Sequence, residues 1–173
     1  GKVELRGQEV AIQPAALVSA EGGEVMIAAS EGGVLEQVQL AEGSLVQVGS
    51  PNGAGGIFQV IGSEQTNVAI HGLIDASGDW GGQVEVTAGE ISVLPFANVQ
   101  AGGATNGGAI SLNAVGSMEI AGLLSARGES GTGGAVQLDA VGDVLVHPTA
   151  QLDASGNRAG GRVGVSAGRN LDV

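Results

Sequence analysis

The chain has 173 residues, of which 33 are glycine and none is cysteine or tyrosine, and its only Phe and Trp residues are Phe58, Trp80 and Phe96. Its 18 acidic and 6 basic residues give a net charge of −12, and no lysine or arginine occurs between Gly7 and Ala126. A phosphate-binding surface needs clustered cations, and disulfides or thiolate metal sites need cysteine. The composition therefore speaks against nucleic acid and anionic membranes as partners, and no apolar run approaches the ~20 residues that span a bilayer.

A Gly-Gly doublet, followed by apolar residues two positions apart, recurs along the whole chain. The doublets begin at Gly22, Gly55, Gly81, Gly107, Gly133 and Gly160, so they are 33, 26, 26, 26 and 27 residues apart. A fixed period of this size is typical of stacked repeats, in which each repeat buries its apolar face against its neighbours.

In chain order, each repeat contains three segments with apolar residues at positions i and i+2, the spacing that returns side chains to one face of a strand. The residue between them is usually polar or small, as a one-sided sheet requires. The expected pairs are, coil by coil, Val3/Leu5, Val10/Ile12 and Val18/Ala20; Val25/Ile27, Val38/Leu40 and Val46/Val48; Phe58/Val60, Val68/Ile70 and Ile74/Ala76; Val84/Val86, Ile91/Val93 and Val99/Ala101; Ile110/Leu112, Met118/Ile120 and Leu124/Ala126; Val136/Leu138, Val144/Val146 and Leu152/Ala154; Val163/Val165 and Leu171/Val173.

The pairs predict an all-β fold, a right-handed parallel β-helix with three short strands per coil, because crossovers between parallel strands are nearly always right-handed. Residues 1–173 form a single domain of six coils and two thirds of a seventh, with roughly 26 residues per coil. Each coil adds about 4.8 Å of length, the spacing between paired strands.

The corners between strands are expected to use glycine at positive φ, in the pairs Ala88-Gly89, Val115-Gly116, Val141-Gly142 and Ala167-Gly168. Coil length varies in two places. One is the corner before each Gly-Gly doublet, which is short at Glu21 and long from Gly49 to Ala54, and the other is an insertion from Ser30 to Gln37. Variable loops of this kind are where specificity usually lies.

The repeat resembles that of the filamentous-haemagglutinin-like exoproteins of two-partner secretion. The similarity lies in Gly1-Lys-Val-Glu-Leu-Arg-Gly-Gln-Glu-Val10, in Leu17 to Ala29, and in later copies such as Leu73-Ile-Asp-Ala-Ser-Gly78 followed by Gly81-Gly-Gln-Val-Glu-Val-Thr-Ala88. The resemblance implies a β-helical rod, secreted or exposed on the surface of Gram-negative-type bacteria and used in adhesion, aggregation or biofilm. The family's N-terminal secretion domain and its Asn-rich motifs are not seen in this chain.

Candidate chemistry is sparse. His71 and His147 occupy the same column of the repeat but lie three coils apart, roughly 14 Å at the strand spacing, which favours surface imidazoles over a metal site. Asp75 and Asp153 share an outward column, also three coils apart, whereas a glycosidase pair sits roughly 5 to 9.5 Å apart. We therefore expect polar surface residues rather than a catalytic pair, and no catalytic residue, metal or cofactor.

Calcium-binding solenoids carry Asp in register after a Gly-Gly doublet, and this chain has apolar alternation there instead. Trp80 lies in a variable corner. It either packs over the apolar end of that turn, the interpretation we favour, or forms an exposed contact for a sugar or a protein.

The sequence predicts a non-enzymatic segment of the shaft of a secreted or cell-surface bacterial adhesin, which presents loops to other surface proteins or glycans. One alternative is a self-associating filament module, with copies joined end to end, because both ends stop inside a coil without an obvious cap. Another is a carbohydrate-active β-helix enzyme, which the long stretch without cations disfavours.

Overall fold

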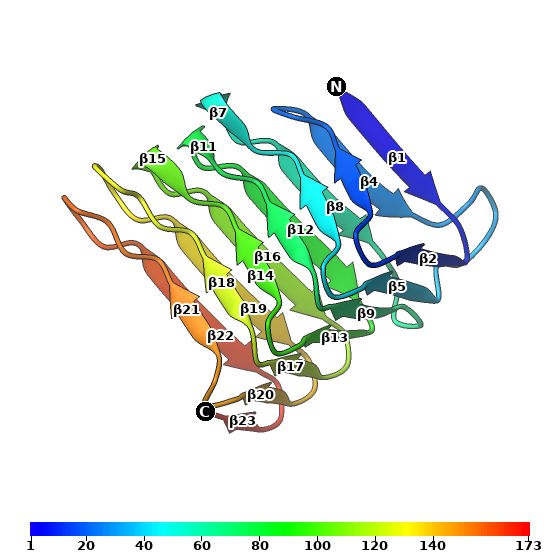
Figure 1. Cartoon of the computed structure of the whole chain (residues 1–173). Coiled ribbons are helices and arrows are strands. Elements are labelled where there is room, and N and C mark those ends of the chain that lie inside the picture. The colour runs from blue at the N-terminus through cyan, green and yellow to red at the C-terminus, as the bar shows by residue number, and fades with distance from the viewer.

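The structure, a computed structural model that describes residues 1–173, contains β-strands and no helix. The strands stack in parallel as a β-solenoid of about seven coils (Figure 1). This confirms the predicted all-β solenoid with three strands per coil. Since there is no helix at all, none could cross a membrane.

The first sheet has seven parallel strands, and its register is the one expected from the doublets. Val84 pairs with Ile110, and Ile110 pairs with Val136, so one apolar column runs through consecutive coils. The strands are β1 (Lys2–Arg6), β4 (Glu24–Ala28), β8 (Ile57–Ile61), β12 (Gln83–Ala88), β16 (Ala109–Ala114), β19 (Ala135–Ala140) and β22 (Arg162–Ala167).

The second and third sheets complete the coil, and the predicted apolar pairs stack in register in both. The second sheet comprises β2 (Glu9–Ile12), β5 (Gln37–Leu40), β9 (Asn67–Ile70), β13 (Glu90–Val93), β17 (Met118–Ile120), β20 (Val144–Val146) and β23 (Leu171–Asp172). The third comprises β3 (Leu17–Ser19), β6 (Leu45–Gln47), β10 (Leu73–Asp75), β14 (Asn98–Gln100), β18 (Leu123–Ser125) and β21 (Gln151–Asp153).

The core between these sheets is almost purely aliphatic. It forms one cluster of 36 buried residues in which Phe58 is the only aromatic side chain. The two buried polar side chains are hydrogen-bonded, because Ser44 donates to Ala41 O at 2.7 Å and Thr66 donates to Leu35 O at 2.6 Å. Leu35 is 2% exposed, so part of the insertion from Ser30 to Gln37 packs in the core instead of forming a free loop.

A fourth sheet was not expected from the sequence. It contains β7 (Ser50–Ala54), β11 (Gly78–Trp80) and β15 (Gly103–Asn106), which pair in parallel along one edge of the stack (Figure 1). Isolated bridges from Gly103 to Gly128 and from Gly128 to Gly156 continue the pairing into the next two coils. We call this edge the flange; it consists of residues 49–55, 77–81, 102–107, 127–133 and 155–160.

Each flange segment leaves the coil and returns to it through a narrow neck. At the neck the second glycine of a doublet donates its N–H to the residue that ends the third-sheet segment, as in Gly82 N to Ala76 O at 2.9 Å and Gly108 N to Ala101 O at 2.7 Å. A Cβ on Gly82 would lie 2.2 Å from Gly56 O and 2.6 Å from Ala76 O. The doublets recur because three backbone segments meet there too closely for a side chain.

The corner glycines have the same explanation, which corrects the expectation of positive φ. Only Gly22, Gly32 and Gly43 have positive φ among the glycines. At the predicted corner Ala88-Gly89, a Cβ on Gly89 would lie 2.1 Å from Glu64 O of the preceding coil. Close stacking of one corner on the next, and not a left-handed backbone, excludes a side chain at this position.

Candidate functional site

An open groove of about 520 Å³ lies where the third sheet meets the flange. Its floor is the outward column of the third sheet, and its wall is the facing column of the flange. The floor residues are Gln47, Asp75, Gln100 and Ser125, and the wall residues include Pro51, Asp79, Ala104 and Glu129.

The groove exists because the flange leaves the coil directly after the third-sheet strands. In each of these strands the apolar residue before the polar one points into the core; Ile74 and Val99 are both 0% exposed. The intervening Asp75 and Gln100 therefore face outward, toward the groove. Since the strands pair in register, these polar groups repeat about every 4.8 Å along the axis.

Asp75 is fixed by the corner that begins the flange. Its Oδ1 accepts the N–H of Ser77 at 2.9 Å, and Asp153 accepts the N–H of Ser155 at 2.8 Å in the same local sequence, Asp-Ala-Ser. Aspartate side chains commonly support turns through a hydrogen bond to the N–H two residues on. The shared contact explains the two aspartates as corner-forming residues.

The groove is anionic with one cation. Asp75, Asp79 and Glu129 line it, and Arg127 is the only basic lining residue. Asp153 lies beyond the lining, where hydrogen bonds from the Ser155 hydroxyl and backbone N–H lower its pKa, with a smaller contribution from the charge of Arg127 and an opposing one from desolvation. Arg127 thus lines the groove and also contributes to the lowered pKa of Asp153 outside it.

The structure does not bring the two sequence-flagged aspartates together. Asp75 lies on β10 and Asp153 on β21, with β14 and β18 between them. Sequence reasoning missed Asp79 and Glu129, which share the groove with Asp75. Both residues lie in the corner before a doublet, which could have suggested a shared surface. Which corner residues face the groove, however, depends on how the strands of the fourth sheet pair.

The two histidines lie apart, each beside a glutamate of the preceding coil. His147 Nε2 is 2.6 Å from Glu119 Oε1, and His71 Nε2 is 3.8 Å from Glu42 Oε2. No group of three or more His, Cys, Asp and Glu side chains lies close enough to hold a metal ion. Each arrangement is therefore a surface contact between neighbouring coils.

Trp80 lies on β11, in the column of Ala54 and Asn106, and is 58% exposed. The favoured expectation, that it packs over the apolar end of its turn, is therefore wrong. Trp80 is not among the residues that line the groove. Its role as a contact for a sugar or a protein stays a prediction.

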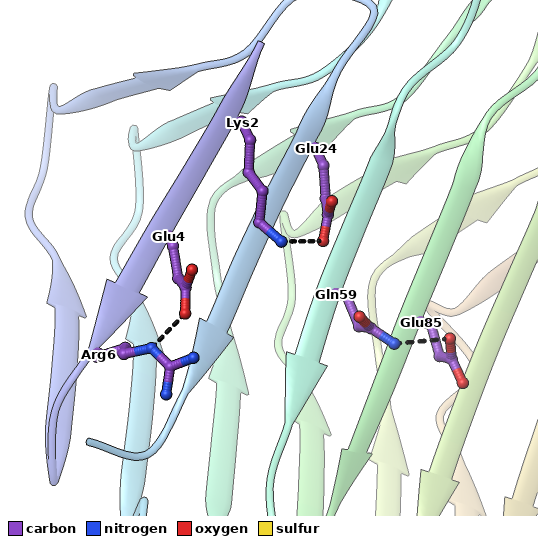
Figure 2. Close-up of polar contacts among 6 residues, drawn as sticks. All are labelled: Lys2, Glu4, Arg6, Glu24, Gln59 and Glu85. Atoms are coloured by element: carbon purple, nitrogen blue, oxygen red, sulfur yellow. Dashed lines mark hydrogen bonds and ion pairs between the residues drawn. The ribbon is translucent and has the colours of Figure 1, made fainter. Parts of the chain in front are cut away.

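The outward face of the first sheet carries polar contacts within and between coils (Figure 2). Lys2 Nζ lies 3.3 Å from Glu24 Oε1 across paired strands, and Gln59 Nε2 donates to Glu85 Oε2 at 3.1 Å. Arg6 pairs with Glu4 on the same strand. These exposed pairs contribute little to stability.

Comparisons with protein-family models, with curated proteins and with solved structures each found no match. The function is therefore argued from the fold and from the chemistry of the surface.

Proposed function

We propose that this chain is part of the shaft of a secreted or cell-surface bacterial adhesin and acts as a structural element, not as an enzyme. The observation that supports this most is the unbroken parallel register from β1 to β22. In such a ladder each coil contacts only its neighbours, so a rod can be lengthened coil by coil without changing its cross-section. Mechanical extension with repeated presentation of surface groups is what this geometry does well.

The coil and the flange have different roles in the proposed shaft. The three sheets of the coil keep the rod straight and repetitive, whereas the flange varies in sequence and presents Asp79, Trp80, Arg127 and Glu129 to solvent. Partners of the shaft are then other surface proteins or glycans that contact the flange. The resemblance of the repeat to filamentous-haemagglutinin-like exoproteins supports the same role and an extracellular location.

A replacement experiment tests the shaft role. In the secreted protein that carries residues 1–173, deletion of this segment should reduce adhesion, and an unrelated β-solenoid with the same number of coils should restore it. Adhesion of whole cells to a coated surface is the readout, with secretion checked by immunoblot. If the replacement behaves like the deletion despite normal secretion, the segment acts through its own residues and the shaft role is wrong.

The alternative enzyme function has a defined location, the groove, with Asp75 and Asp79 as the carboxylates to test. We expect no turnover of polyuronides or neutral glycans above a blank. Turnover that is abolished by Asp75→Asn, measured by release of reducing ends, would replace the shaft proposal with a carbohydrate-active enzyme.

End-to-end association is a second proposal, because the terminal coils expose apolar side chains. Val3, Leu5 and Val18 are only partly buried at one end, and Leu171 and Val173 are 50% and 85% exposed at the other. An uncovered strand edge and apolar cross-section template pairing with a further coil or another copy. Sedimentation velocity should show concentration-dependent axial oligomers that Val165→Asp suppresses, and a strict monomer at high concentration would contradict this.

A further inference from the structure

The corner between the second and third sheets has two sizes along the rod. It is a four-residue turn in the first, second, fourth and sixth coils, each closed by an N–H to C=O hydrogen bond of 2.9 to 3.1 Å between its ends. In the third and fifth coils it is only the pairs His71-Gly72 and Ala121-Gly122. The four-residue turns are Gln13 to Ala16, Ala41 to Ser44, Leu94 to Ala97 and His147 to Ala150.

The third position of these turns needs a left-handed backbone in three of the four cases. Gly43 has φ of 77°, as expected for a residue that favours this region, and Ala15 has φ of 61°. In the fourth coil the same position is Phe96, with φ of 70°. A bulky residue at positive φ is a genuine outlier. In the preceding four-residue turn, two coils earlier, the equivalent position is Gly43.

The Phe96 side chain gains nothing from packing in return for this strain. It is 85% exposed, whereas the other phenylalanine, Phe58, is fully buried in the core. The positive φ strains the backbone, and the exposed ring contributes no burial to the free energy of folding. Backbone outliers of this kind cluster at functional sites, including sites of ligand contact.

A hollow of about 370 Å³ lies beside this ring, and the alternation of corner sizes creates it. The short corner Ala121-Gly122 is recessed between the turn that carries Phe96 and the turn that carries Thr149. The hollow extends to the first residues of three third-sheet strands, Asn98, Leu123 and Gln151. Its volume lies at the small end of the range for ligand sites.

The lining combines apolar and hydrogen-bonding side chains. Pro95, Phe96 and Leu123 supply apolar surface, Asn98 and Gln151 supply amides, and no lining residue is charged. Asn98 Oδ1 is buried without a hydrogen-bond partner, which is rare. The Thr149 hydroxyl is already used, because it donates to Ala121 O at 3.1 Å.

We propose that this hollow binds a neutral sugar ring of a glycan, which stacks on Phe96 and places its hydroxyl groups toward Asn98 and Gln151. A sugar ring offers an apolar face and a rim of hydroxyl donors and acceptors, which matches a lining with both an aromatic ring and amide groups. An acidic sugar would meet no cation in the hollow and would approach a chain of net charge −12. This site is independent of the shaft proposal, since it is a property of the isolated chain.

Titration of the chain with neutral hexasaccharides tests the proposal, with cellohexaose, laminarihexaose, maltohexaose and fully N-acetylated chitohexaose as probes. Amide chemical shifts from NMR should change for Ala97, Asn98 and Leu123 with at least one probe. Oligogalacturonate of the same length should cause no change at these amides. Absence of shifts with all four neutral probes, or equal shifts with oligogalacturonate, would overturn the proposal.

Phe96→Gly separates recognition from folding, because glycine at this position relieves the strain. We expect the dissociation constant of the best probe to rise about tenfold or more, with no fall in the midpoint of urea unfolding. Ala15→Gly, at the equivalent position of the first coil, is the matched control and should leave binding unchanged. Gln151→Ala should weaken binding by a few fold. Full binding by Phe96→Gly would show that the ring is not part of the site.

Discussion

The coil and the flange are built from the same 26-residue period and follow opposite rules. In the coil, side chains pair in register and disappear into an aliphatic core, as Val84, Ile110 and Val136 do with at most 1% exposure. In the flange, backbones pair, but the side chains point into solvent; Trp80 is 58% exposed and Asp79 lines the groove. Hydrophobic burial fixes the coil, whereas the flange is held by backbone pairing and by the necks that join it to the coil.

The largest effect is expected in the core. Replacing Ile110 with Asp removes a buried side chain and places a carboxylate among apolar neighbours, so we expect destabilisation of about 5 kcal/mol or failure to fold. Ser111→Asp, one residue away on the outward face, should be nearly neutral apart from a small repulsion by Glu85 in the same column. Urea unfolding of both variants measures the contrast, and equal destabilisation would mean that the assigned faces are wrong.

Substitutions in the necks are expected to cause the second-largest loss of stability. In Gly81→Ala the new Cβ would lie 2.1 Å from Gly108 N and 2.2 Å from Ala101 O, so the neck of the next coil must open. We expect a loss of about 3 kcal/mol in the free energy of unfolding. Gly160→Ala, at the same position of the last doublet, has nothing within 4 Å of the new Cβ and is the matched control. An effect of alanine on the unfolded chain would stabilise both variants, so a similar loss in both would show that the close contacts at the neck are not the cause.

The flange itself should be removable at small cost. The first coil turns from Ala20 to Gly23 through Glu21 and Gly22 alone, and Gly23 N still donates to Ala20 O at 2.7 Å. Replacing residues 102–107 with Glu-Gly should therefore cost only about 1 kcal/mol, because it removes exposed backbone pairs and leaves the core intact. Thermal unfolding followed by circular dichroism checks this, and loss of the cooperative transition would mean that the flange helps to hold the coils together.

These contrasts also explain what could be read from the sequence. The three sheets of the coil and their register were predictable because a buried face imposes apolar alternation, and pairs such as Ile74/Ala76 and Val99/Ala101 repeat it once in every coil. The fourth sheet left no such signal. Gly78 to Trp80 and Gly103 to Asn106 bury no apolar face, so nothing in the residue pattern distinguishes a paired strand there from a loop.

The sites divide in the same way. Asp75 could be placed in an outward column because it lies in the coil, whereas its groove partners Asp79 and Glu129 lie in the flange and needed the register of the fourth sheet. The site at Phe96 could not be predicted from the sequence for another reason. The sequence Leu-Pro-Phe-Ala indicates a turn but does not fix the sign of φ at its third residue, which is positive at Phe96 and is not positive at Thr149 in the similar turn His-Pro-Thr-Ala. The recess beside Phe96 depends on the size of the neighbouring corner.

The smallest effect concerns Asp153, at the junction of coil and flange. Hydrogen bonds from the Ser155 hydroxyl and N–H lower the pKa of its carboxyl in the folded chain below the usual value of about 4. A carboxyl with a lowered folded-state pKa stabilises the fold above the unfolded-state value, and this contribution is lost as the pH falls through the folded-state value. Since the side chain is only partly buried, solvent screens these interactions and the contribution is small.

Unfolding in urea from pH 6 to pH 3 therefore measures how firmly the coil holds the start of the flange. The stability difference between the native chain and Asp153→Asn should be constant above about pH 5 and should shrink below about pH 4, because asparagine does not titrate. Ser155→Ala removes the hydroxyl donor, the largest cause of the lowered pKa, and should reduce the same pH dependence. A difference between the native chain and Asp153→Asn that is unchanged at pH 3 would show that the carboxylate charge contributes nothing to this junction.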